Sequence, residues 1–324
     1  MPDHTIFSDP KLDADTLEVL KKGVAPHRLI LPEKVASSVL SQAEADPAFV
    51  EADIAFGQPL IESIKASSKL KWIHLSTAGF TRYDTPEFRA YAKEKGLVVT
   101  NSSGVYAYAC AEHVFSFMLA QARNLPASLA LRVPNGHPEW TALRNSYRPL
   151  RGQQVLILGF GGIATPLVKM LAPFDMDVVA MRRTPRGDEG VRVVTPAEVD
   201  GVLATADHVI NILPDNAESV GYFNAARFAS MKPGSAFYNI GRGTTVDQDA
   251  LYETLKSGHL GAAWLDVTVP EPLADDHPLW TLDNCHITPH TAGGHGNESL
   301  TLVNHFLGNL RRYVNGEPLV DRIM

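Results

Sequence analysis

Three side chains with complementary acid–base chemistry each follow a short apolar run in the second half of the chain. Arg242 follows SAFYNIG, Glu271 follows GAAWLDVTVP, and His290 follows CHITP. Hydride transfer to a 2-oxo acid needs a cation for the carboxylate, a proton donor for the carbonyl oxygen, and a partner that keeps the donor protonated. A guanidinium, an imidazole and a carboxylate meet these needs. Each residue alone has an ordinary structural interpretation, but together they are the candidate catalytic residues.

A glycine-rich turn upstream of these residues predicts a dinucleotide site. The apolar run VLIL leads into Gly159, Gly161 and Ala164, a G-x-G-x-x-A spacing, and the helical stretch TPLVKMLAPF follows. The first glycine allows a tight turn, the second lets the backbone approach a pyrophosphate, and the helix start offers N–H groups to phosphate. The alternative is a glycine turn of an ordinary α/β protein. The strand before the turn and the helix after it favour dinucleotide binding.

Positive charge follows the second strand of this expected dinucleotide domain. DVVAM is followed by Arg182, Arg183 and Thr184, at the place where a turn that prefers NAD has a carboxylate. A guanidinium binds a 2′-phosphate through paired hydrogen bonds, whereas a carboxylate repels it. The sequence therefore predicts NADP(H) as the preferred coenzyme, with NAD(H) also possible. The alternative is two solvated arginines at the end of a strand.

Alternating strand and helix patterns indicate the elements that must position these residues. The first part predicts strands in HRLILP, ADIAFG, KWIHLST and GLVVTN, and helices in PEKVASSVLSQAEAD and PLIESIKASSKL. After Gly152, six further strands are expected in QVLILG, DVVAMR, HVINIL, SAFYNI, GAAWLDV and CHITPH. Such alternation is typical of parallel sheets with helices on both faces, which bind ligands at the carboxyl ends of their strands. We therefore expect an α/β fold with the candidate residues at one sheet edge.

Two further stretches connect these parts. AYACAEHVFSFMLAQARN is helical and apolar on most sides, which predicts a buried helix or a domain connector. LPASLALRVPNGHPEWTALRNSYRPLRG contains four prolines and is expected to be an irregular arm that packs on a second subunit. The final stretch, SLTLVNHFLGNLRRYV, starts as a helix and is expected to return to the first domain.

Several other side chains are expected to have structural roles. Tyr106 and Tyr108 could face the cleft or belong to the core, and the core is the favoured interpretation. Trp264 and Trp280 are assigned to packing. His113, beside Glu112, is expected to be a helix residue with a partner. Cys110 and Cys285 fit no disulfide framework or zinc spacing and are expected to be small hydrophobic residues. His295 and His305 show no metal-binding spacing, so we expect no metal.

Composition argues against several classes of protein. The 324 residues are 45% hydrophobic and 20% charged, with a formal net charge of −7, as expected for one large or two ordinary globular domains. A protein that binds nucleic acid non-specifically would carry a basic face. No apolar stretch approaches the roughly 20 residues of a membrane helix, and the first residues show no pattern of a secretory signal. We therefore expect a cytoplasmic protein with no nucleic-acid partner and no membrane partner.

The sequence resembles the D-isomer-specific 2-hydroxyacid dehydrogenases, in particular those of the glyoxylate/hydroxypyruvate reductase type. The likeness is carried by LGFGGIA, NIGRG, VDQDALYETLKSGHLGAAWLDV, PEPL and TPHTAGG, in the order and approximate spacing of that family, and continues more weakly through HLSTAGFTRYD. The resemblance implies an NAD(P)-dependent oxidoreductase that interconverts a 2-oxo acid and a D-2-hydroxy acid by hydride transfer. Arg242, Glu271 and His290 would be its catalytic residues, with His290 as general acid and base, and the protein would be a homodimer.

The resemblance also implies the domains and the remaining site residues. A Rossmann-type dinucleotide-binding domain would span residues 102–293, and a smaller flavodoxin-like substrate domain would combine residues 1–101 with 294–324. Backbone around Thr77, Ala78 and Gly79 would hold the substrate carboxylate, Asp266 would lie near the nicotinamide amide, and Pro214 would line the cofactor cleft. The other expected cofactor contacts are Gly159, Phe160, Gly161, Gly162, Ile163, Arg182, Arg183, Thr184, Leu213, Ile240, Gly241, His290 and Gly293.

Some departures from the family pattern leave alternatives open. Arg182 replaces the usual acidic residue, and NAES, from Asn216, replaces a stretch that is usually rich in threonine. Formate enzymes of similar sequence pair the histidine with glutamine, so Glu271 argues against that activity. A phosphite-type dehydrogenase keeps the same three residues, and so does a corepressor-like protein that binds a dinucleotide as a sensor.

Overall fold

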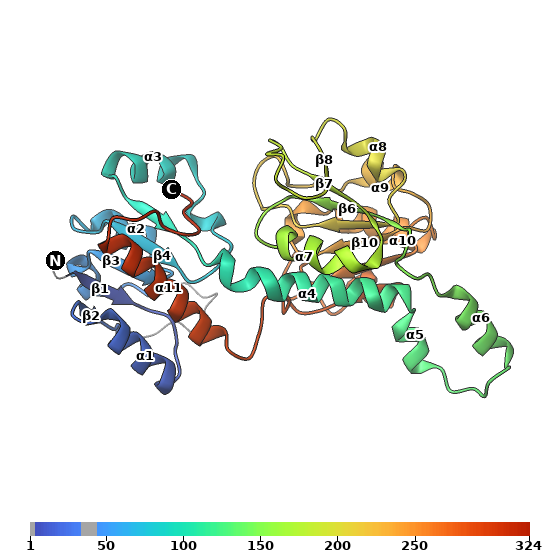
Figure 1. The fold of residues 1–324 in the computed structure, drawn as a ribbon, viewed down its shortest axis with the longest axis horizontal. Helices are drawn as coiled ribbons and strands as arrows, with labels where there is room; N and C mark the ends of the chain where they lie inside the picture. The colour runs from blue at the N-terminus through green and yellow to red at the C-terminus, as the bar shows by residue number, and fades with distance from the viewer. Residues whose placement is uncertain (1–3, 34–43) are drawn as a thin grey trace. The chain divides into compact units, whose positions relative to one another are not determined.

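The computed structural model describes residues 4–33 and 44–324, and the chain forms two compact units (Figure 1). Unit 1 comprises Met1–Tyr106 and His295–Met324, and unit 2 comprises Ala107–Gly294. The chain passes from the first unit to the second inside helix α4 (Ser103–Ala122). The helix expected in PEKVASSVLSQAEAD falls mostly on residues 34–43, which lie outside the described residues.

Unit 1 contains a five-stranded parallel sheet with the order β2-β1-β3-β4-β5. This is the flavodoxin-like strand order, as predicted. Its strands are β1 (Thr5–Ser8), β2 (Arg28–Ile30), β3 (Ile54–Gly57), β4 (Trp72–Leu75) and β5 (Val98–Thr100). Its helices are α1 (Ala14–Val24), α2 (Ile61–Ala66), α3 (Pro86–Lys95) and α11 (Glu298–Val314). The sequence patterns did not anticipate β1, α1 or α3.

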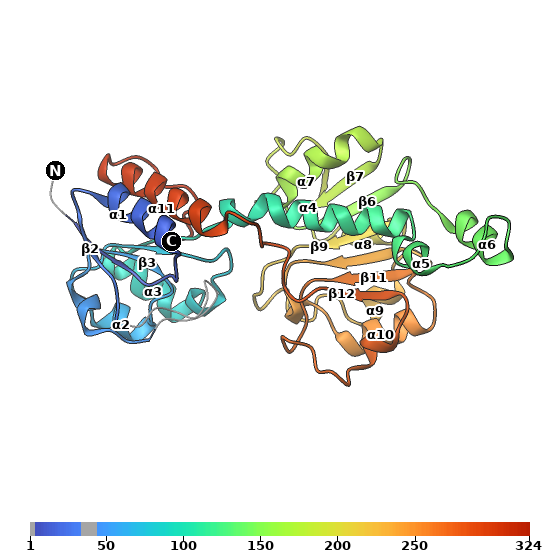
Figure 2. The same cartoon turned by 90° about the horizontal axis from the view of Figure 1, so that it is seen from below.

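Helices cover both faces of the unit 1 sheet because successive strand residues point to opposite sides. Ile6 packs with one buried cluster that includes residues of α1 and α11, whereas its neighbour Phe7 packs with the cluster of α2 and α3. Helices α1 and α11 lie side by side in both views (Figures 1 and 2). Trp72 on β4 stacks on Phe306 of α11, with ring centroids 5.5 Å apart. The C-terminal helix therefore belongs to the core of unit 1.

Unit 2 contains a seven-stranded parallel sheet with the order β12-β11-β10-β9-β6-β7-β8. Numbered along the chain, the first six strands of this unit have the order 3-2-1-4-5-6, which is that of a doubly wound dinucleotide-binding fold. The seventh strand, β12, adds to the edge beside β11. The strands are β6 (Gln154–Leu158), β7 (Asp177–Met181), β8 (Arg192–Val194), β9 (His208–Asn211), β10 (Ala236–Asn239), β11 (Ala262–Leu265) and β12 (Cys285–Ile287). The expectation of six strands was wrong, because β8 has only three residues and its pattern was too short to stand out.

The unit 2 sheet is also covered on both faces. Val155 and Ile157 of β6 pack with α4 and α7 (Ala164–Leu171), whereas Leu156 and Leu158 pack on the opposite face. That opposite face carries α8 (Val199–Leu203), α9 (Ala225–Ala229) and α10 (Gln248–Lys256) (Figure 2). Five short 3-10 helices complete the described elements: Pro47–Glu51, Thr81–Tyr83, Ala172–Phe174, Gly243–Thr245 and Pro278–Thr281. The predicted α/β class with two parallel sheets is confirmed.

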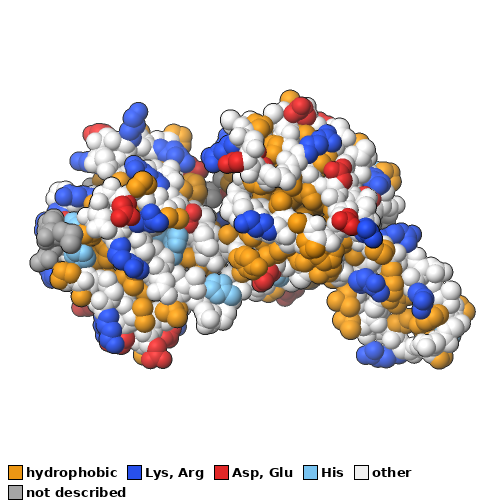
Figure 3. All heavy atoms as spheres, in the orientation of Figure 1, with side chains coloured by type: hydrophobic (Ala, Val, Ile, Leu, Met, Phe, Trp, Pro, Cys, Tyr) orange, Lys and Arg blue, Asp and Glu red, His pale blue; other side chains and the backbone are white. Residues whose placement is uncertain are grey.

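The segment expected to be an irregular arm contains two helices. They are α5 (Leu125–Ala130) and α6 (Pro138–Ser146), which extend from the end of α4 (Figure 1). The expectation was wrong because Pro126 and Pro138 lie in first helical turns, where proline is tolerated. Neither helix has a buried residue. Hydrophobic side chains are therefore visible on the surface of the arm in Figure 3.

Two aromatic residues assigned to the interior lie at the surface. Tyr108 is 60% exposed and Trp280 is 50% exposed, so those predictions were wrong. The Tyr108 hydroxyl can face water, whereas Trp280 Nε1–H donates to Ala274 O over 3.0 Å. Trp264 is buried as predicted, and Tyr106 is partly buried against the unit 1 core. Across the described ranges, none of the helices has both the length and the apolar character needed to cross a bilayer.

Candidate active site

His290 and Glu271 form a directly bonded pair in unit 2. His290 Nδ1–H donates to Glu271 Oε2 over 2.7 Å. This hydrogen bond raises the pKa of His290 above its ordinary value, against the opposing effects of burial and of the Arg242 charge. Burial by itself raises the pKa of Glu271, but the His290 hydrogen bond, the Thr268 N–H and the Arg242 charge together lower it. The pair therefore favours a charged imidazole beside an ionised carboxylate.

Asp266 fixes the loop that carries His290. Its Oδ1 accepts from Thr288 Oγ1–H (2.6 Å) and Thr291 N–H (2.8 Å), and its Oδ2 accepts from Ala292 N–H (2.9 Å). Its carbonyl accepts from His290 N–H over 2.9 Å. These bonds satisfy a carboxylate that is only 2% exposed. They also hold His290 at φ +51°, a left-handed conformation that is uncommon for a residue with a side chain.

Arg242 stands just after β10 and is partly buried. Its carbonyl accepts from Asn239 Nδ2 (3.0 Å) and from Thr245 Oγ1 (2.6 Å), and its Nη1 donates to the carbonyl of the preceding glycine (2.6 Å). The Arg242 charge lowers the pKa of both Glu271 and His290. The structure therefore brings the three sequence-predicted catalytic residues into one electrostatic neighbourhood.

Two buried asparagines shape the neighbouring strand ends. Asn211 Oδ1 accepts from Leu213 N–H (3.2 Å), and Asn239 Oδ1 accepts from Gly241 N–H (3.1 Å). Asn211 Nδ2 also donates to Thr245 Oγ1 over 2.6 Å. These bonds fix the loops after β9 and β10, which pack so closely that a Cβ on Gly241 would lie 2.8 Å from Leu213 O. The sequence analysis missed both asparagines, although each ends an apolar run.

His113 on α4 lies behind the His290 loop. Its Nε2 is 3.2 Å from Thr288 Oγ1 and 3.6 Å from Asp266 Oδ1, so its partners are these residues rather than Glu112. Because Thr288 already donates its hydroxyl hydrogen to Asp266, it accepts from His113 Nε2–H. Burial lowers the pKa of His113, against the opposing charge of Asp266, which favours this neutral donor. Sequence reasoning gave His113 no place near the site.

The glycine turn between β6 and α7 has the shape that a dinucleotide needs. Gly159 has φ +104°, and a Cβ there would lie 3.2 Å from Ile212 O. A Cβ on Gly161 would meet no atom within 4 Å, so this glycine borders open space. Gly161 and Gly162 are exposed at the start of the eight-residue helix α7. The turn therefore fits a pyrophosphate, with Gly161 leaving the room that the phosphates need.

The two arginines after β7 already have carboxylate partners. Arg182 Nη1 donates to Glu189 Oε1 over 3.1 Å, with side chains that are 19% and 2% exposed respectively. Arg183 Nη1 donates to Glu218 Oε2 over 3.0 Å, and both of those side chains are more than 70% exposed (73% and 74%). Thr184 is exposed next to them. Sequence reasoning missed Glu189, which is seven residues from Arg182 in the chain.

The remaining predicted residues fall in two places. Pro214, Ile240 and Gly293 follow β9, β10 and β12 respectively, at the carboxyl edge of the unit 2 sheet. Thr77, Ala78 and Gly79 follow β4, at the carboxyl edge of the unit 1 sheet. Thr77 is 8% exposed, and its hydroxyl accepts from Gln58 Nε2 over 2.7 Å. Within residues 4–33 and 44–324, no group of three or more His, Cys, Asp and Glu side chains forms a metal site.

The fold and the site define a dinucleotide-binding α/β protein with acid–base residues at the edge of its sheet. Comparisons with known proteins support this class. A family model described as D-isomer specific 2-hydroxyacid dehydrogenase, NAD binding domain, matches residues 115–292. Human glyoxylate reductase/hydroxypyruvate reductase is 32% identical over 268 residues, which cover 80% of this chain and 78% of the human protein.

Two solved structures extend the likeness over the whole chain. A D-isomer specific 2-hydroxyacid dehydrogenase family protein from Aeromonas salmonicida has a TM-score of 0.79 and 28% identity, covering 100% of this chain and 99% of its own. A D-isomer specific 2-hydroxyacid dehydrogenase from Xanthobacter autotrophicus, in complex with NADPH and MES, has a TM-score of 0.79 and 27% identity, covering 100% and 98%. This chain belongs to the D-isomer specific 2-hydroxyacid dehydrogenase family. The resemblance stated from the sequence is confirmed, and membership supports an NAD(P)-linked oxidoreductase of 2-hydroxy and 2-oxo acids.

Proposed function

We propose that this protein reduces a 2-oxo acid to a D-2-hydroxy acid with NADPH and also catalyses the reverse reaction. The hydrogen bond of 2.7 Å between His290 Nδ1 and Glu271 Oε2 carries the proposal. It keeps the imidazole protonated and leaves Nε2 available, since no described residue forms a hydrogen bond with that atom. A positioned imidazole of this kind is a general acid for a developing alkoxide. We take glyoxylate and hydroxypyruvate as first substrates, because the human relative bears their names.

Each catalytic residue has a separate task in the proposed reaction. Arg242 binds the substrate carboxylate with its guanidinium. The backbone N–H groups of residues 77–79, in unit 1, are also proposed to bind a carboxylate. The reduced nicotinamide supplies the hydride when it is bound. His290 donates its Nε2 proton to the carbonyl oxygen as negative charge builds there, and Glu271 stabilises the imidazolium until then. In the reverse direction, neutral His290 accepts the proton of the substrate hydroxyl.

The coenzyme site is proposed along the carboxyl edge of the unit 2 sheet. The turn of Gly159, Phe160, Gly161, Gly162 and Ile163 would hold the pyrophosphate, and Arg182, Arg183 and Thr184 would hold the 2′-phosphate. Leu213, Pro214, Ile240, Gly241, Asp266 and Gly293 would complete the site. The Xanthobacter structure contains NADPH, which supports this preference, whereas the Glu189 carboxylate beside Arg182 weakens it. NAD(H) is therefore the second coenzyme to test.

A turnover assay tests the proposal directly. The purified chain is mixed with glyoxylate, hydroxypyruvate or pyruvate and with NADPH or NADH. Chiral chromatography identifies D-glycerate or D-lactate from the last two substrates, whereas the achiral glycolate from glyoxylate is identified by mass spectrometry. We expect His290→Asn to lower kcat by at least about 100-fold while the dissociation constant of NADPH stays unchanged. Near-normal kcat in His290→Asn would show that this residue is not the general acid.

The same assay separates the two alternative functions. Oxidation of phosphite with NAD(P)⁺, without reduction of any 2-oxo acid, would indicate the phosphite-type activity. Binding of NADPH without turnover of any substrate would indicate a dinucleotide sensor of the corepressor type. Both alternatives keep Arg242, Glu271 and His290, so turnover, rather than the presence of these residues, distinguishes them from the proposed reductase.

We also propose that the protein is a homodimer held by the arm, residues 125–146. Leu125 and Leu129 on α5 are 43% and 65% exposed, which is unusual for two leucines one turn apart on a monomer. A depression of about 340 Å³ lies at the root of the arm and could receive apolar side chains of a second copy. It is lined by Leu119, Ala122, Arg123, Pro149, Leu150, Arg151, Pro173, Phe174 and Asp175.

A further inference from the structure

The last residues of the chain lie along the edge strand of the unit 1 sheet. Thr100 forms an antiparallel bridge with Arg322, and Ile323 N–H donates to Val99 O over 2.9 Å. Asn101 N–H donates to the carbonyl of Asp321 over 3.0 Å. The tail thus pairs with β5 and with the residue that follows it, and covers backbone groups that an edge strand leaves open.

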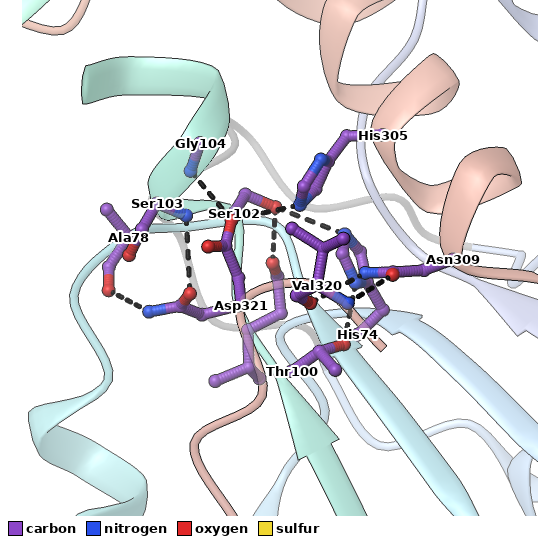
Figure 4. A network of polar contacts seen from close by, with 12 residues as sticks. His74, Ala78, Thr100, Ser102, Ser103, Gly104, His305, Asn309, Val320 and Asp321 are labelled. Atoms are coloured by element: carbon purple, nitrogen blue, oxygen red, sulfur yellow. Dashed lines mark hydrogen bonds and ion pairs between the residues drawn. The ribbon is translucent and has the colours of Figure 1, made fainter. Parts of the chain in front are cut away.

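Helix α11 also holds the C-terminal tail, and this contact fixes the position of the Asp321 side chain. Asn309 on α11 is 1% exposed, and its amide donates to Val320 O (3.0 Å) and accepts from Val320 N–H (2.9 Å) (Figure 4). This pair of bonds fixes the backbone immediately before Asp321. Asp321 itself has φ +56°, a left-handed conformation that turns the chain at this point. The side chain of Asp321 is therefore directed by two elements, β5 and α11.

Asp321 caps the first turn of α4, which leads out of unit 1. Its Oδ2 accepts from Gly104 N–H over 2.7 Å and lies 3.1 Å from His305 Nε2 on α11 (Figure 4). A carboxylate at a helix N-terminus is favourable because the free N–H groups there carry partial positive charge. Burial by itself would raise the pKa of Asp321, but the bonds from His305 and Gly104 lower it, so the cap is ionised.

The residues beside this cap hold the segment 75–79 by its carbonyl groups. Each of the five carbonyls has a donor, and three of these donors come from Asn101 and Ser102. The bonds are Ser102 Oγ to Leu75 O (2.7 Å), Tyr106 OH to Ser76 O (2.9 Å), Ser102 N to Thr77 O (3.0 Å), Asn101 Nδ2 to Ala78 O (2.7 Å) and Thr77 Oγ1 to Gly79 O (2.6 Å).

A buried histidine fixes the orientation of Ser102. Because the Ser102 hydroxyl donates to Leu75 O, it accepts from His74 Nε2–H (3.3 Å). His74 Nδ1 then accepts from Thr100 Oγ1–H (2.7 Å), whose oxygen accepts from Trp72 Nε1–H (2.9 Å). Burial keeps the pKa of His74 well below its ordinary value, so the ring is neutral. Its single ring hydrogen is then on Nε2, which donates to Ser102.

These contacts use the carbonyl groups of the segment, and the backbone N–H groups of residues 77–79 have no partner among the described residues. In the part of the chain that the structure describes, the N–H groups of Thr77, Ala78 and Gly79 meet no hydrogen-bond acceptor. Unpaired backbone N–H groups need an acceptor, and successive ones bind anions. An anion is therefore the ligand that completes this segment, and it depends on the carbonyl contacts of Asn101 and Ser102.

We propose that Asp321 is a positioning residue for the anion-binding segment 77–79. Its carboxylate fixes the start of α4, the start of α4 fixes Asn101 and Ser102, and these residues hold the carbonyls of the segment so that its N–H groups stay available. The inference rests on the proposed function in one respect, namely that the anion is the carboxylate of a 2-oxo acid. The C-terminal tail is then part of substrate recognition, although Asp321 itself touches no substrate.

Kinetics of Asp321 variants test this role. We expect Asp321→Ala to raise KM for glyoxylate or hydroxypyruvate at least about fivefold, the effect of losing one helix cap, with kcat reduced less. The dissociation constant of NADPH, measured by fluorescence, should not change because that site belongs to unit 2. Asp321→Asn keeps an oxygen for Gly104 N–H and should restore part of the loss. Glu317→Ala is the matched control, because Glu317 is an exposed carboxylate near the tail whose side chain contacts Arg312 and Asn315.

Hydrogen exchange followed by mass spectrometry provides a readout that needs no turnover. Asp321→Ala should speed exchange in residues 76–80 and 101–106 and leave residues of unit 2 unchanged. If that variant does not fold, Asp321→Asn carries the test. An unchanged KM, or an equal rise in KM for Glu317→Ala, overturns the proposal. If the unsubstituted chain reduces no 2-oxo acid, the proposed function fails on its own, and unchanged exchange in residues 76–80 would then overturn the role of Asp321 separately.

Discussion

Arg182 is bonded to Glu189, a carboxylate that the protein holds with three donors. Glu189 Oε1 accepts from Arg182 Nη1 (3.1 Å) and Arg186 N–H (2.7 Å), and its Oε2 accepts from Gly187 N–H (2.8 Å). These bonds, the Arg186 N–H first, keep the pKa of Glu189 below its ordinary value. The arginine proposed to bind a 2′-phosphate therefore carries a fixed negative charge beside it.

Removing that charge should increase the preference for NADPH over NADH. A glutamine at position 189 keeps the Oε1 acceptor for Arg182 and Arg186 N–H, so the guanidinium keeps its place while the repulsion of phosphate disappears. We expect Glu189→Gln to raise the ratio of kcat/KM for NADPH to that for NADH by about three- to tenfold, a coupling typical of one nearby charge. Glu218→Gln, at the exposed pair with Arg183, should change the ratio much less. A lower ratio in Glu189→Gln would mean that the carboxylate orients Arg182 more than it neutralises it.

The pH dependence of reduction should follow the His290–Glu271 bond. The pKa of His290 is raised chiefly by its hydrogen bond to Glu271. Reduction needs protonated His290, so kcat/KM is full below this pKa and falls as pH rises through it. Glu271→Gln removes the charge that raises the pKa, so the falling limb should move to lower pH and activity at pH 8 should suffer more than activity at pH 6. The pH profile of kcat/KM for hydroxypyruvate measures this shift. If the falling limb does not move in Glu271→Gln, the charge of Glu271 does not set the pKa of His290.

Two glycines near the coenzyme site should respond differently to alanine. A Cβ on Gly161 meets nothing within 4 Å, whereas a Cβ on Gly243 would lie 2.1 Å from Thr268 O. We expect Gly161→Ala to keep the melting temperature but to weaken NADPH binding by about tenfold or more, since the backbone can no longer approach the pyrophosphate. Gly243→Ala should destabilise the fold by about 1–3 kcal/mol, the usual effect of overpacking. Calorimetric unfolding and NADPH titration of both variants compare the two effects, and a stable Gly161→Ala with full affinity would place the pyrophosphate elsewhere.

The sequence predicted those parts of the site whose pattern is local. The strand, turn and helix around Gly159 lie within a short segment, and each predicted catalytic residue follows an apolar run that becomes a strand of one parallel sheet. Because parallel strands end at a common edge, the order along the chain was enough to bring Arg242, Glu271 and His290 together. The strand pattern likewise predicted both sheets apart from β1 and β8, which have four and three residues.

What the sequence could not predict depends on contacts between distant residues or on weak local signals. Asp321 meets Gly104 across 217 residues, and no spacing rule connects them. Glu189 reaches Arg182 only because the intervening loop folds back through its own backbone bonds. The arm helices were missed because their prolines suggested a loop, although proline in a first turn begins a helix. The core was the favoured interpretation for Tyr108, but helix α4 exposes this side chain.

The exposed leucines of the arm give a test of the proposed dimer. Leu129 on α5 is 65% exposed. If a second copy covers it, an aspartate at this position would place a charge in an apolar contact, which is unfavourable. We expect Leu129→Asp to shift the protein towards monomer in light scattering coupled to size exclusion, with Asp188→Asn, far from α5 in the chain, as a surface control. An unchanged mass for a dimeric protein would place the interface elsewhere, and a monomeric unsubstituted chain would refute the dimer itself.

A buried acid in unit 1 should make stability depend on pH. Asp9 follows β1 and is 1% exposed, its Oδ1 accepts from Gln58 N–H (3.0 Å), and its Oδ2 has no partner among the described residues. Burial raises the pKa of Asp9 from 3.8 to about 7, against the opposing Gln58 bond. The folded state therefore keeps a proton that the unfolded state loses first, so stability falls as pH rises from about 4 to about 7.

Asp9→Asn should remove this loss because the amide stays neutral and can still accept from Gln58 N–H. At pH 5 the variant should be more stable by only about 1–2 kcal/mol, because this pH lies little more than one unit above the ordinary Asp pKa of 3.8 at which the unfolded state loses its proton. At pH 8 the variant should be more stable, by at most about 4 kcal/mol, the upper bound that the difference in pKa allows. Thermal unfolding at both pH values measures the difference, with the exposed Asp15→Asn as control. A gain of equal size at pH 5 and pH 8 would show that the carboxylate of Asp9 does not titrate in this range.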